Sequence, residues 1–372
     1  MAPEPTPRAD LTLQLNLCAG DLAYCEHTVP ALVAHHRPEV REVVAVVDCC
    51  RPPSTPFLHS PSRFPPDEFA ARVRTLRARC RDWQAAGLWD RVVLLEPAPA
   101  QLRALNGRYC GLRTAASHDH WGHAFSAYFA AWDCATTRYV VHYDADILLH
   151  QAPGFSWVRE AVIALQQDET LLAVSPRIAP PPAAALSAMV NVNDPGSGWL
   201  PTWPLKAAPG GWRSGWTSTR CHLMDGARLR SLLPLVPRRG RAWQRASWTV
   251  HTALTPAYRL RMWAGPLPAH GPARAAGRAA RWLARHFVPP FPLPPEVLLH
   301  EHAARRGVQC LYLGTGQAWY VHPDSKPPAF LEMLPRLQEA VRRGACPPAQ
   351  LGRSGIDLAA WAAFLNHAPA RA

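Results

Sequence analysis

The chain has 372 residues, 48% of them hydrophobic, and is therefore long enough to bury a large core. No window approaches the roughly 18 consecutive apolar residues that a membrane-spanning helix needs, and Met1 to Pro7 lacks the basic and apolar parts of a signal peptide. The net charge of +13 favours anionic partners such as phosphates, acidic glycans or a membrane surface. We therefore expect a cytoplasmic globular protein, with residues 1–9 as a disordered leader.

The bias toward arginine weakens this interpretation of the net charge, and the cysteine spacing bears on zinc sites and disulfides. The 40 basic residues are almost all arginine, because Lys206 and Lys326 are the only lysines, and there are also 40 prolines. This bias is typical of GC-rich coding, which weakens any adaptive interpretation of the arginines. None of the ten cysteines forms a CxxC pair, so buried free thiols in a reducing compartment are favoured over zinc sites or disulfides.

In chain order, the first 175 residues alternate strand-like and helix-like patterns. The expected strands cover 11–17, 43–48, 91–95, 139–144 and 171–174, and the expected helices cover 26–36, 67–86, 114–133 and 156–167. The proline-rich segment 52–66 reads as a loop. Such alternation predicts an α/β fold with a mainly parallel sheet and helices on both of its sides.

After residue 176 the sequence becomes less regular. Segments 179–185 and 196–215 are rich in proline, glycine and tryptophan, as expected of loops over a site. The expected elements are a strand at 216–224, helices at 227–233 and 295–306, and a strand at 308–313. We expect one α/β domain over 10–326, with halves 10–176 and 177–326, followed by a C-terminal helical tail over 327–372.

The most informative stretch is Tyr139 to Leu148, in which an apolar, β-prone run meets two carboxylates, Asp144 and Asp146. A strand that is buried on both faces should not end in paired negative charge unless a positive partner compensates it, and a divalent cation is the natural partner. On an extended backbone, side chains at i and i+2 share a face and can bind one object together. Asp48 also ends an expected strand, and parallel sheets bind ligands beyond such carboxyl ends.

These segments resemble the GT-A fold of nucleotide-sugar glycosyltransferases, most closely the inverting family-2 type, over about residues 11–323. Residues 43–48 resemble the strand whose last aspartate contacts the nucleobase, and residues 139–146 match the strand that leads to the DxD motif. Residues 295–307 resemble the acidic helix that supplies the catalytic base. The strand at 308–313 and the segment 319–323 then follow in the expected order.

The resemblance implies a metal-dependent, inverting transfer of a sugar from a nucleoside diphosphate donor to a hydroxyl acceptor. It assigns Asp48 to the nucleobase, Asp146 to direct metal binding, and Asp144 to the ribose or to the metal through water. His322 would complete the site for Mn²⁺ or Mg²⁺, whose charge offsets that of the diphosphate. Gly122 is a candidate donor contact, although its segment replaces a motif with arginine and asparagine that the family normally carries.

A general base must take the proton of the attacking hydroxyl, which contributes roughly 10²–10⁴-fold to the rate. Glu296 is the candidate from the resemblance, and Asp225 is the reserve. The family's usual Glu-Asp pair is reduced here to Pro295-Glu296. A first-turn helix acid is also an ordinary structural feature, so this alternative stays open for Glu296.

Further residues carry expectations beside which a structural alternative stays open. Trp212 and Trp216 could stack on an acceptor sugar or form a hydrophobic plug under a loop, as could Trp199 and Trp203. Arg274, Arg278, Arg281 and Arg285 form a basic stripe that could contact anionic lipid near a lipid-linked acceptor, or simply be solvated. His118, His120 and His123 could bind a metal or begin a helix. Asp48 could cap a turn, and His322 could be an ordinary loop histidine.

Two other functions compete with glycosyl transfer. A nucleotidyltransferase would need a phosphate loop rich in glycine and lysine near the first strand, and Leu15 to Asp21 lacks one. A basic nucleic-acid-binding protein would use the arginine-rich segments, but they are scattered and form no recognisable module. We therefore expect no nucleic-acid partner; the acceptor is expected to be a glycan, a lipid-linked sugar or a small molecule, with possible peripheral contact at the inner membrane surface.

Overall fold

The computed structural model describes residues 10–54, 58–119, 122–181, 205–236 and 294–367. The leader at 1–9, the basic stripe at 274–285, His120, Trp199 and Trp203 lie outside these residues. Among the described residues, no helix is both long enough and apolar enough to cross a bilayer.

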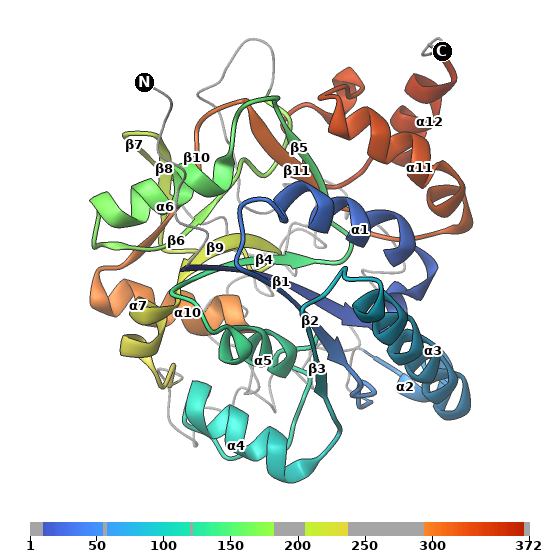
Figure 1. The fold of residues 1–372 in the computed structure, drawn as a ribbon, viewed down its shortest axis with the longest axis vertical. Helices are drawn as coiled ribbons and strands as arrows, with labels where there is room; N and C mark the ends of the chain where they lie inside the picture. Colours follow the sequence, from blue (N-terminus) through green and yellow to red (C-terminus); the bar gives the residue numbers. More distant parts are fainter. Residues whose placement is uncertain (1–9, 55–57, 120–121, 182–204, 237–293, 368–372) are drawn as a thin grey trace, which may run out of the picture.

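A mixed sheet of nine strands, in the order β3-β2-β1-β4-β9-β6-β10-β8-β7, forms the centre of the described structure (Figure 1). The strands are β1 (Leu11–Cys18), β2 (Glu42–Asp48), β3 (Arg91–Leu95), β4 (Tyr139–Asp144), β6 (Leu171–Ser175), β7 (Lys206–Ala208), β8 (Gly211–Ser214), β9 (Cys221–Asp225) and β10 (Gln309–Leu313). Strands β3, β2, β1 and β4 pair in parallel, as do β6 and β10. Strand β9 runs antiparallel between β4 and β6, and β8 and β7 form an antiparallel edge.

Helices lie on both sides of this sheet, which confirms the α/β class (Figure 1). The helices of the described structure are α1 (Cys25–His36), α2 (Ser60–Arg63), α3 (Pro66–Ala85), α4 (Pro99–Cys110), α5 (Ser126–Cys134), α6 (Trp157–Gln167), α7 (Gly226–Leu232), α10 (Pro295–Arg306), α11 (Pro328–Arg342) and α12 (Leu358–His367). A short 3₁₀ turn, η2 (Ala19–Ala23), follows β1. A second sheet pairs β5 (Leu148–Gln151) with β11 (Ala318–Val321) in antiparallel orientation.

The buried residues form one hydrophobic core, which explains the positions of the strands. All seven residues of β2 are buried, as expected of a β-branched run in the middle of a parallel sheet. The tail helices belong to the same core through buried Phe330 and Leu334 of α11 and Trp361 of α12. Helix α11 also contacts β5, so the tail packs on the domain rather than standing apart from it.

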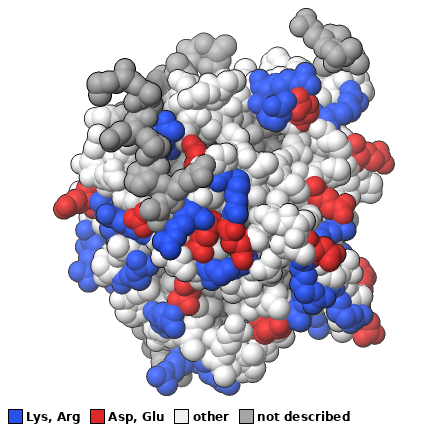
Figure 2. Space-filling view, viewed as in Figure 1, with Lys and Arg blue, Asp and Glu red and all other residues white. Residues whose placement is uncertain are grey.

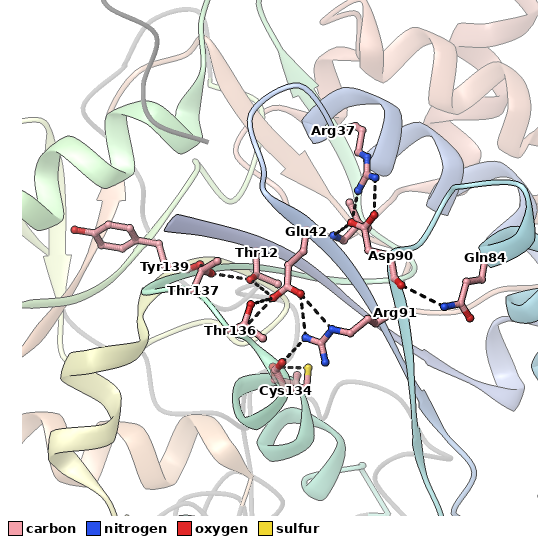
Figure 3. A network of polar contacts seen from close by, with 12 residues as sticks. Thr12, Arg37, Glu42, Gln84, Asp90, Arg91, Cys134, Thr136, Thr137 and Tyr139 are labelled. Carbon is pink, nitrogen blue, oxygen red and sulfur yellow. Dashed lines mark hydrogen bonds and ion pairs between the residues drawn. The ribbon is translucent and has the colours of Figure 1, made fainter. Parts of the chain in front are cut away.

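A network of hydrogen bonds around Glu42 fixes the edge of the nine-stranded sheet at which β2 begins (Figure 3). The Glu42 carboxylate accepts hydrogen bonds from Thr12 Oγ1 at 2.8 Å, from the N–H and hydroxyl of Thr136 at 3.0 and 2.7 Å, and from Arg91 Nη2 at 3.1 Å. These donors come from β1, from the segment before β4, and from β3. Although burial opposes it, these donors hold the pKa of Glu42 below its ordinary value.

Four expectations about elements are wrong. Segment 52–66, expected as a loop, contains α2, and segment 196–215, also expected as loop, contains β7 and β8. Helix α5 begins at Ser126 rather than at residue 114, because the preceding segment is held as a loop by Asn106, whose Nδ2 donates to the carbonyl groups of Thr114 and Ala116 at 2.9 Å. The strand expected at 216–224 begins only at Cys221. Helix α4, which the sequence analysis did not predict, carries Asn106.

Candidate functional site

The chain adds its next strands first on one side of β1 and then, with β4, on the other side. From β1 the chain adds β2 and then β3 on one side, whereas β4 pairs with the other side of β1. Because β1, β2 and β4 are parallel, their carboxyl ends lie at the same edge of the sheet. Ligands of open α/β sheets bind outside this edge at such a reversal. The candidate site is therefore built from the residues that follow these three strands.

A group of charged or titratable side chains meets at this edge, and we call it the carboxyl-edge cluster. Its members are Asp21, Asp48, Asp144, Asp146, Arg220, Glu296, His322 and Lys326. Each of them either shifts the pKa of another member through its charge or has its own pKa shifted by the charge of another member. The cluster thus brings together five of the residues predicted from the sequence.

Asp144 is the last residue of β4 and remains partly accessible, with 22% of its side chain exposed. The Tyr128 hydroxyl lies 2.9 and 3.0 Å from its two carboxylate oxygens, and His142 Nε2 lies 3.3 Å from Oδ1. Burial raises the pKa of Asp144, and the neighbouring charge of Asp146 raises it further. The neutral Tyr128 hydroxyl therefore holds the Asp144 carboxylate, and a cation added beside this carboxylate would lower its pKa.

The chain turns immediately after β4, which corrects the expectation that Asp144 and Asp146 share one face of an extended strand. The Ile147 N–H donates to the carbonyl of Asp144 at 3.3 Å, so Asp146 lies inside a turn. The two carboxylates are nevertheless close enough for the charge of one to raise the pKa of the other. The turn, rather than strand periodicity, brings them together.

Two cationic side chains contact the predicted metal ligands. Lys326 Nζ lies 2.7 Å from Asp146 Oδ2, and Arg220 Nη1 lies 2.6 Å from His322 Nδ1. Although burial lowers it, the pKa of Lys326 is raised by the charge of Asp146, and the same holds for Arg220. Arg220 directly precedes β9, and its carbonyl accepts the N–H of Asp144 at 2.9 Å. Both cations therefore belong to the framework of the site.

His322 follows β11 and is 7% exposed. Its backbone is fixed on both sides, since its N–H donates to Ser354 at 3.0 Å and its carbonyl accepts from Ile356 at 3.1 Å. Burial, followed by the charge of Arg220, lowers the pKa of His322 to about 4. The imidazole is thus neutral near pH 7, the form that can bind a metal ion.

Two carboxylates and a neutral imidazole are chemically suited to Mn²⁺ or Mg²⁺. The described residues nevertheless contain no group of three such side chains arranged to hold a metal ion. In this arrangement Lys326 contacts Asp146 and Arg220 contacts His322. The donor types fit a divalent cation, but binding by all three residues requires these cationic side chains to move.

The carboxyl ends of β1 and β2 contribute Asp21 and Asp48. Oδ2 of Asp21 accepts the N–H of Cys18 at 2.7 Å, and the Tyr24 hydroxyl donates to its other oxygen. Burial raises the pKa of Asp21 to about 6. The Asp21 carboxylate is therefore fixed in the loop that follows β1.

Asp48 is 3% exposed, and its Oδ1 accepts the N–H of Cys50 at 2.8 Å. Its Oδ2 is buried and has no hydrogen-bond partner among the described residues. Burial raises the pKa of Asp48 to about 7. A buried acceptor of this kind is costly to the fold, and it is suited to a ligand N–H.

Glu296 lies in the first turn of α10, directly after Pro294 and Pro295. Its Oε1 accepts a hydrogen bond from the Thr219 hydroxyl. Burial raises the pKa of Glu296, while Thr219 and the charge of Arg220 act in the opposite direction and that of Asp144 raises it further. The predicted base is therefore oriented by a neighbour and lies in the same cluster as the DxD carboxylates.

Asp225 does not belong to this cluster, so its assignment as a reserve base is wrong. It pairs with Tyr139 at the start of β4, whereas the cluster gathers at the other end of that strand. The side chain is fully buried, accepts the N–H groups of Ala227 and Arg228, and forms an ion pair with Arg138 at 2.9 Å. Asp225 is the N-cap of α7.

The structure also corrects the acceptor assignment of the two tryptophans. Trp212 and Trp216 are 9% and 6% exposed, and Trp216 belongs to the hydrophobic core. The Arg177 guanidinium lies 5.3 Å from the centre of the Trp212 ring. Rings buried in this way are not available for stacking on a sugar, so the structure supports the alternative of a hydrophobic plug.

Gly122 has a structural reason for being glycine. Its φ is +86°, and a Cβ atom at this position would lie 2.5 Å from Leu58 Cδ2. Its neighbour His123 forms an ion pair with buried Asp119, and His118 contacts Ser117 at 2.8 Å. A donor contact of Gly122 stays a prediction, while the described histidines of this segment have protein partners.

Sequence reasoning missed Asp21, Arg220 and Lys326, and only Asp21 and Lys326 have a signal that can be recognised in the sequence. Asp21 follows an expected strand end, and Lys326 is one of only two lysines. Arg220 precedes a strand whose antiparallel pairing with β4 places it beside Asp144, which the sequence does not reveal. No protein-family model matches the chain, and no curated protein is significantly similar to it.

Proposed function

We propose that this protein is a GT-A-like glycosyltransferase that transfers a sugar from a nucleoside diphosphate donor to a hydroxyl acceptor, with inversion. One observation carries the proposal. Asp48, Asp144, Asp146, Glu296 and His322 come from four separate segments, and all join the carboxyl-edge cluster. The reaction needs a nucleotide contact, anionic metal ligands and a base side by side, and these residues supply the three groups.

The donor nucleoside is expected at the ends of β1 and β2. The unpaired Oδ2 of Asp48 can accept an N–H of the nucleobase, which would satisfy a buried acceptor that the protein leaves unpaired. Asp144, beside Tyr128, is placed for the ribose or for a water bound to the metal. Donor binding would thus recover part of the free energy that burial of Asp48 costs.

The diphosphate is expected near Asp146 and His322, which would hold Mn²⁺ or Mg²⁺. A bound divalent cation supplies positive charge that offsets the negative charge growing on the leaving diphosphate. Asp146 provides carboxylate oxygen from a turn, and His322 provides a neutral nitrogen from a backbone held on both sides. The protein's own contribution is to fix these donors at the edge of the sheet.

Glu296 is the proposed general base. As the acceptor oxygen attacks the anomeric carbon, its proton passes to the Glu296 carboxylate and the bond between sugar and diphosphate breaks. The Thr219 hydroxyl binds one carboxylate oxygen, which leaves the other to receive the proton. The raised pKa of Glu296 strengthens it as a base. A single displacement of this kind inverts the anomeric configuration.

The competing functions receive less support from the described residues. A nucleotidyltransferase would bind triphosphate beyond β1, where the described loop carries the carboxylate of Asp21. On the face shown in Figure 2, Lys and Arg side chains are interspersed with Asp and Glu rather than gathered in one basic patch. The acceptor is proposed to be a glycan, a lipid-linked sugar or a small molecule, and the protein is proposed to act in the cytoplasm.

A thermal-shift panel tests this proposal. UDP, GDP, CDP and ADP are added to the full chain with and without Mn²⁺, and we expect one of them to cause a rise in Tm that the metal enlarges; this metal-dependent shift is the readout. Asp146→Asn should abolish this shift, whereas Asp225→Asn, a change in a buried aspartate outside the cluster, should preserve it. No shift with any nucleotide, or an equal shift in the Asp146 variant, would refute the proposal. Release of pyrophosphate rather than nucleoside diphosphate would favour nucleotidyl transfer.

A further inference from the structure

Lys326 and Arg220 occupy the positions around the predicted metal ligands. Lys326 Nζ lies 2.7 Å from Asp146, where a cation bound to that carboxylate would lie. Arg220 donates to the imidazole of His322 at 2.6 Å, which uses the one nitrogen lone pair that a metal would need. The two side chains that these cations contact are mostly buried, since only 17% of the Asp146 side chain and 9% of the His322 side chain are exposed.

The two cations also lie where an anion can reach them. Lys326 is 31% exposed, and Arg220 is among the exposed residues. Lys326 is additionally positioned by the ring of Tyr24, whose centre lies 5.1 Å from Nζ. A doubly charged phosphate group would attract both side chains, because ammonium and guanidinium groups are strong donors to phosphate oxygen.

We propose that Lys326 and Arg220 form a diphosphate-binding subsite, and that without an anion they block Asp146 and His322 against a divalent cation. This inference rests on the proposed function, since it assigns the leaving group of that reaction to named residues. A diphosphate that binds Lys326 and Arg220 releases the carboxylate and the imidazole at the same time. Metal and diphosphate therefore bind cooperatively, and by linkage each strengthens the other by the same factor.

The first experiment titrates Mn²⁺ alone into the full chain by calorimetry. Lys326→Met removes the charge but keeps a long side chain, and it should bind Mn²⁺ about fivefold more tightly than wild type, the factor expected for loss of a partly exposed ion pair of roughly 1 kcal/mol. Lys326→Arg keeps the charge and should behave like wild type. Lys206→Met is the matched control, because Lys206 is the other lysine of the chain and is exposed on edge strand β7.

The second experiment titrates inorganic pyrophosphate without metal, which removes any dependence on the nucleobase. Lys326→Met and Arg220→Gln should each weaken pyrophosphate binding about tenfold, as expected for loss of one charge-assisted contact. Lys206→Met should have no effect. Circular dichroism and urea unfolding of each variant establish that the fold is retained.

Equal or weaker Mn²⁺ binding by Lys326→Met, or unchanged pyrophosphate binding by both cluster variants, would overturn the inference. Absence of Mn²⁺ binding in wild type and Lys326→Met alike would also overturn it. Failure of the proposed function has a different signature. In that case, the protein would bind Mn²⁺ and pyrophosphate with the expected variant effects, but it would show no thermal shift with any nucleoside diphosphate.

Discussion

Asp48 offers the sharpest separation between a structural and a functional role. Burial raises its pKa from 3.8 to about 7, and Oδ2 has no partner among the described residues. The folded state therefore binds the proton more tightly than the unfolded state does. In this case, stability is highest below the unfolded pKa and is lost as the pH rises through the folded pKa.

The magnitude follows from the shift. About three pKa units at 1.36 kcal/mol each correspond to roughly 4 kcal/mol of lost stability above the folded pKa, as an order of magnitude. At about pH 5 the folded carboxyl is protonated, and the remaining penalty falls to roughly 1.5 kcal/mol. Asp48→Asn removes the charge at every pH, so it should stabilise the protein at about pH 8 by up to this amount and by less at about pH 5.

The assay compares urea unfolding of wild type and Asp48→Asn at both pH values, together with calorimetric titration of the nucleoside diphosphate that gives the largest thermal shift. We expect higher stability and weaker nucleotide binding from the same variant. Asp225→Asn is the control, because this buried carboxylate is paired with Arg138 and caps α7. It should lower stability and leave nucleotide affinity unchanged. An Asp48 variant that is less stable at about pH 8, or that binds nucleotide as tightly as wild type, would refute the reasoning.

Three further outcomes are expected. Glu296→Gln should slow release of nucleoside diphosphate from a sugar nucleotide by roughly 10²–10⁴-fold while nucleotide affinity is unchanged; parallel loss of both would assign Glu296 to binding instead. Glu42→Gln should lower the free energy of unfolding by about 1–3 kcal/mol, measured in urea, with a difference that shrinks as the pH falls through the lowered pKa of Glu42; a difference independent of pH would contradict this. Gly122→Ala should cost about 1–3 kcal/mol because φ is positive and Leu58 is close; a neutral effect would show that the loop relaxes.

Local patterns were sufficient to predict many of the elements. Strand β3 and helix α10 have the predicted bounds, and β2 differs by one residue, because apolar runs mark the two strands and Pro294 and Gly307 flank the helix. The region before α5 was predicted wrongly because its conformation depends on Asn106, a residue of another helix. Such tertiary hydrogen bonds leave no periodic signal in the segment that they shape.

In the candidate site, too, local sequence patterns predict some positions, whereas others depend on tertiary structure. Asp48 and Asp144 could be placed at one edge because the carboxyl ends of parallel strands coincide. Asp225 was misplaced because β9 runs antiparallel, which sends its last residue to the opposite edge, and this reversal is not visible in the sequence of the strand. For the same reason, the sequence does not show that Arg220, directly before β9, lies beside Asp144. Burial of Trp212 and Trp216 likewise depends on packing rather than on their glycine-rich surroundings.

The most direct test of the proposed site is a crystal structure of the full chain with Mn²⁺ and the nucleoside diphosphate selected by thermal shift, with the metal located by its anomalous scattering. We expect one manganese peak within ligand distance of the Asp146 carboxylate and of a diphosphate oxygen, with the nucleobase against Asp48. A nucleotide bound elsewhere, or a manganese ion remote from Asp146, would contradict it.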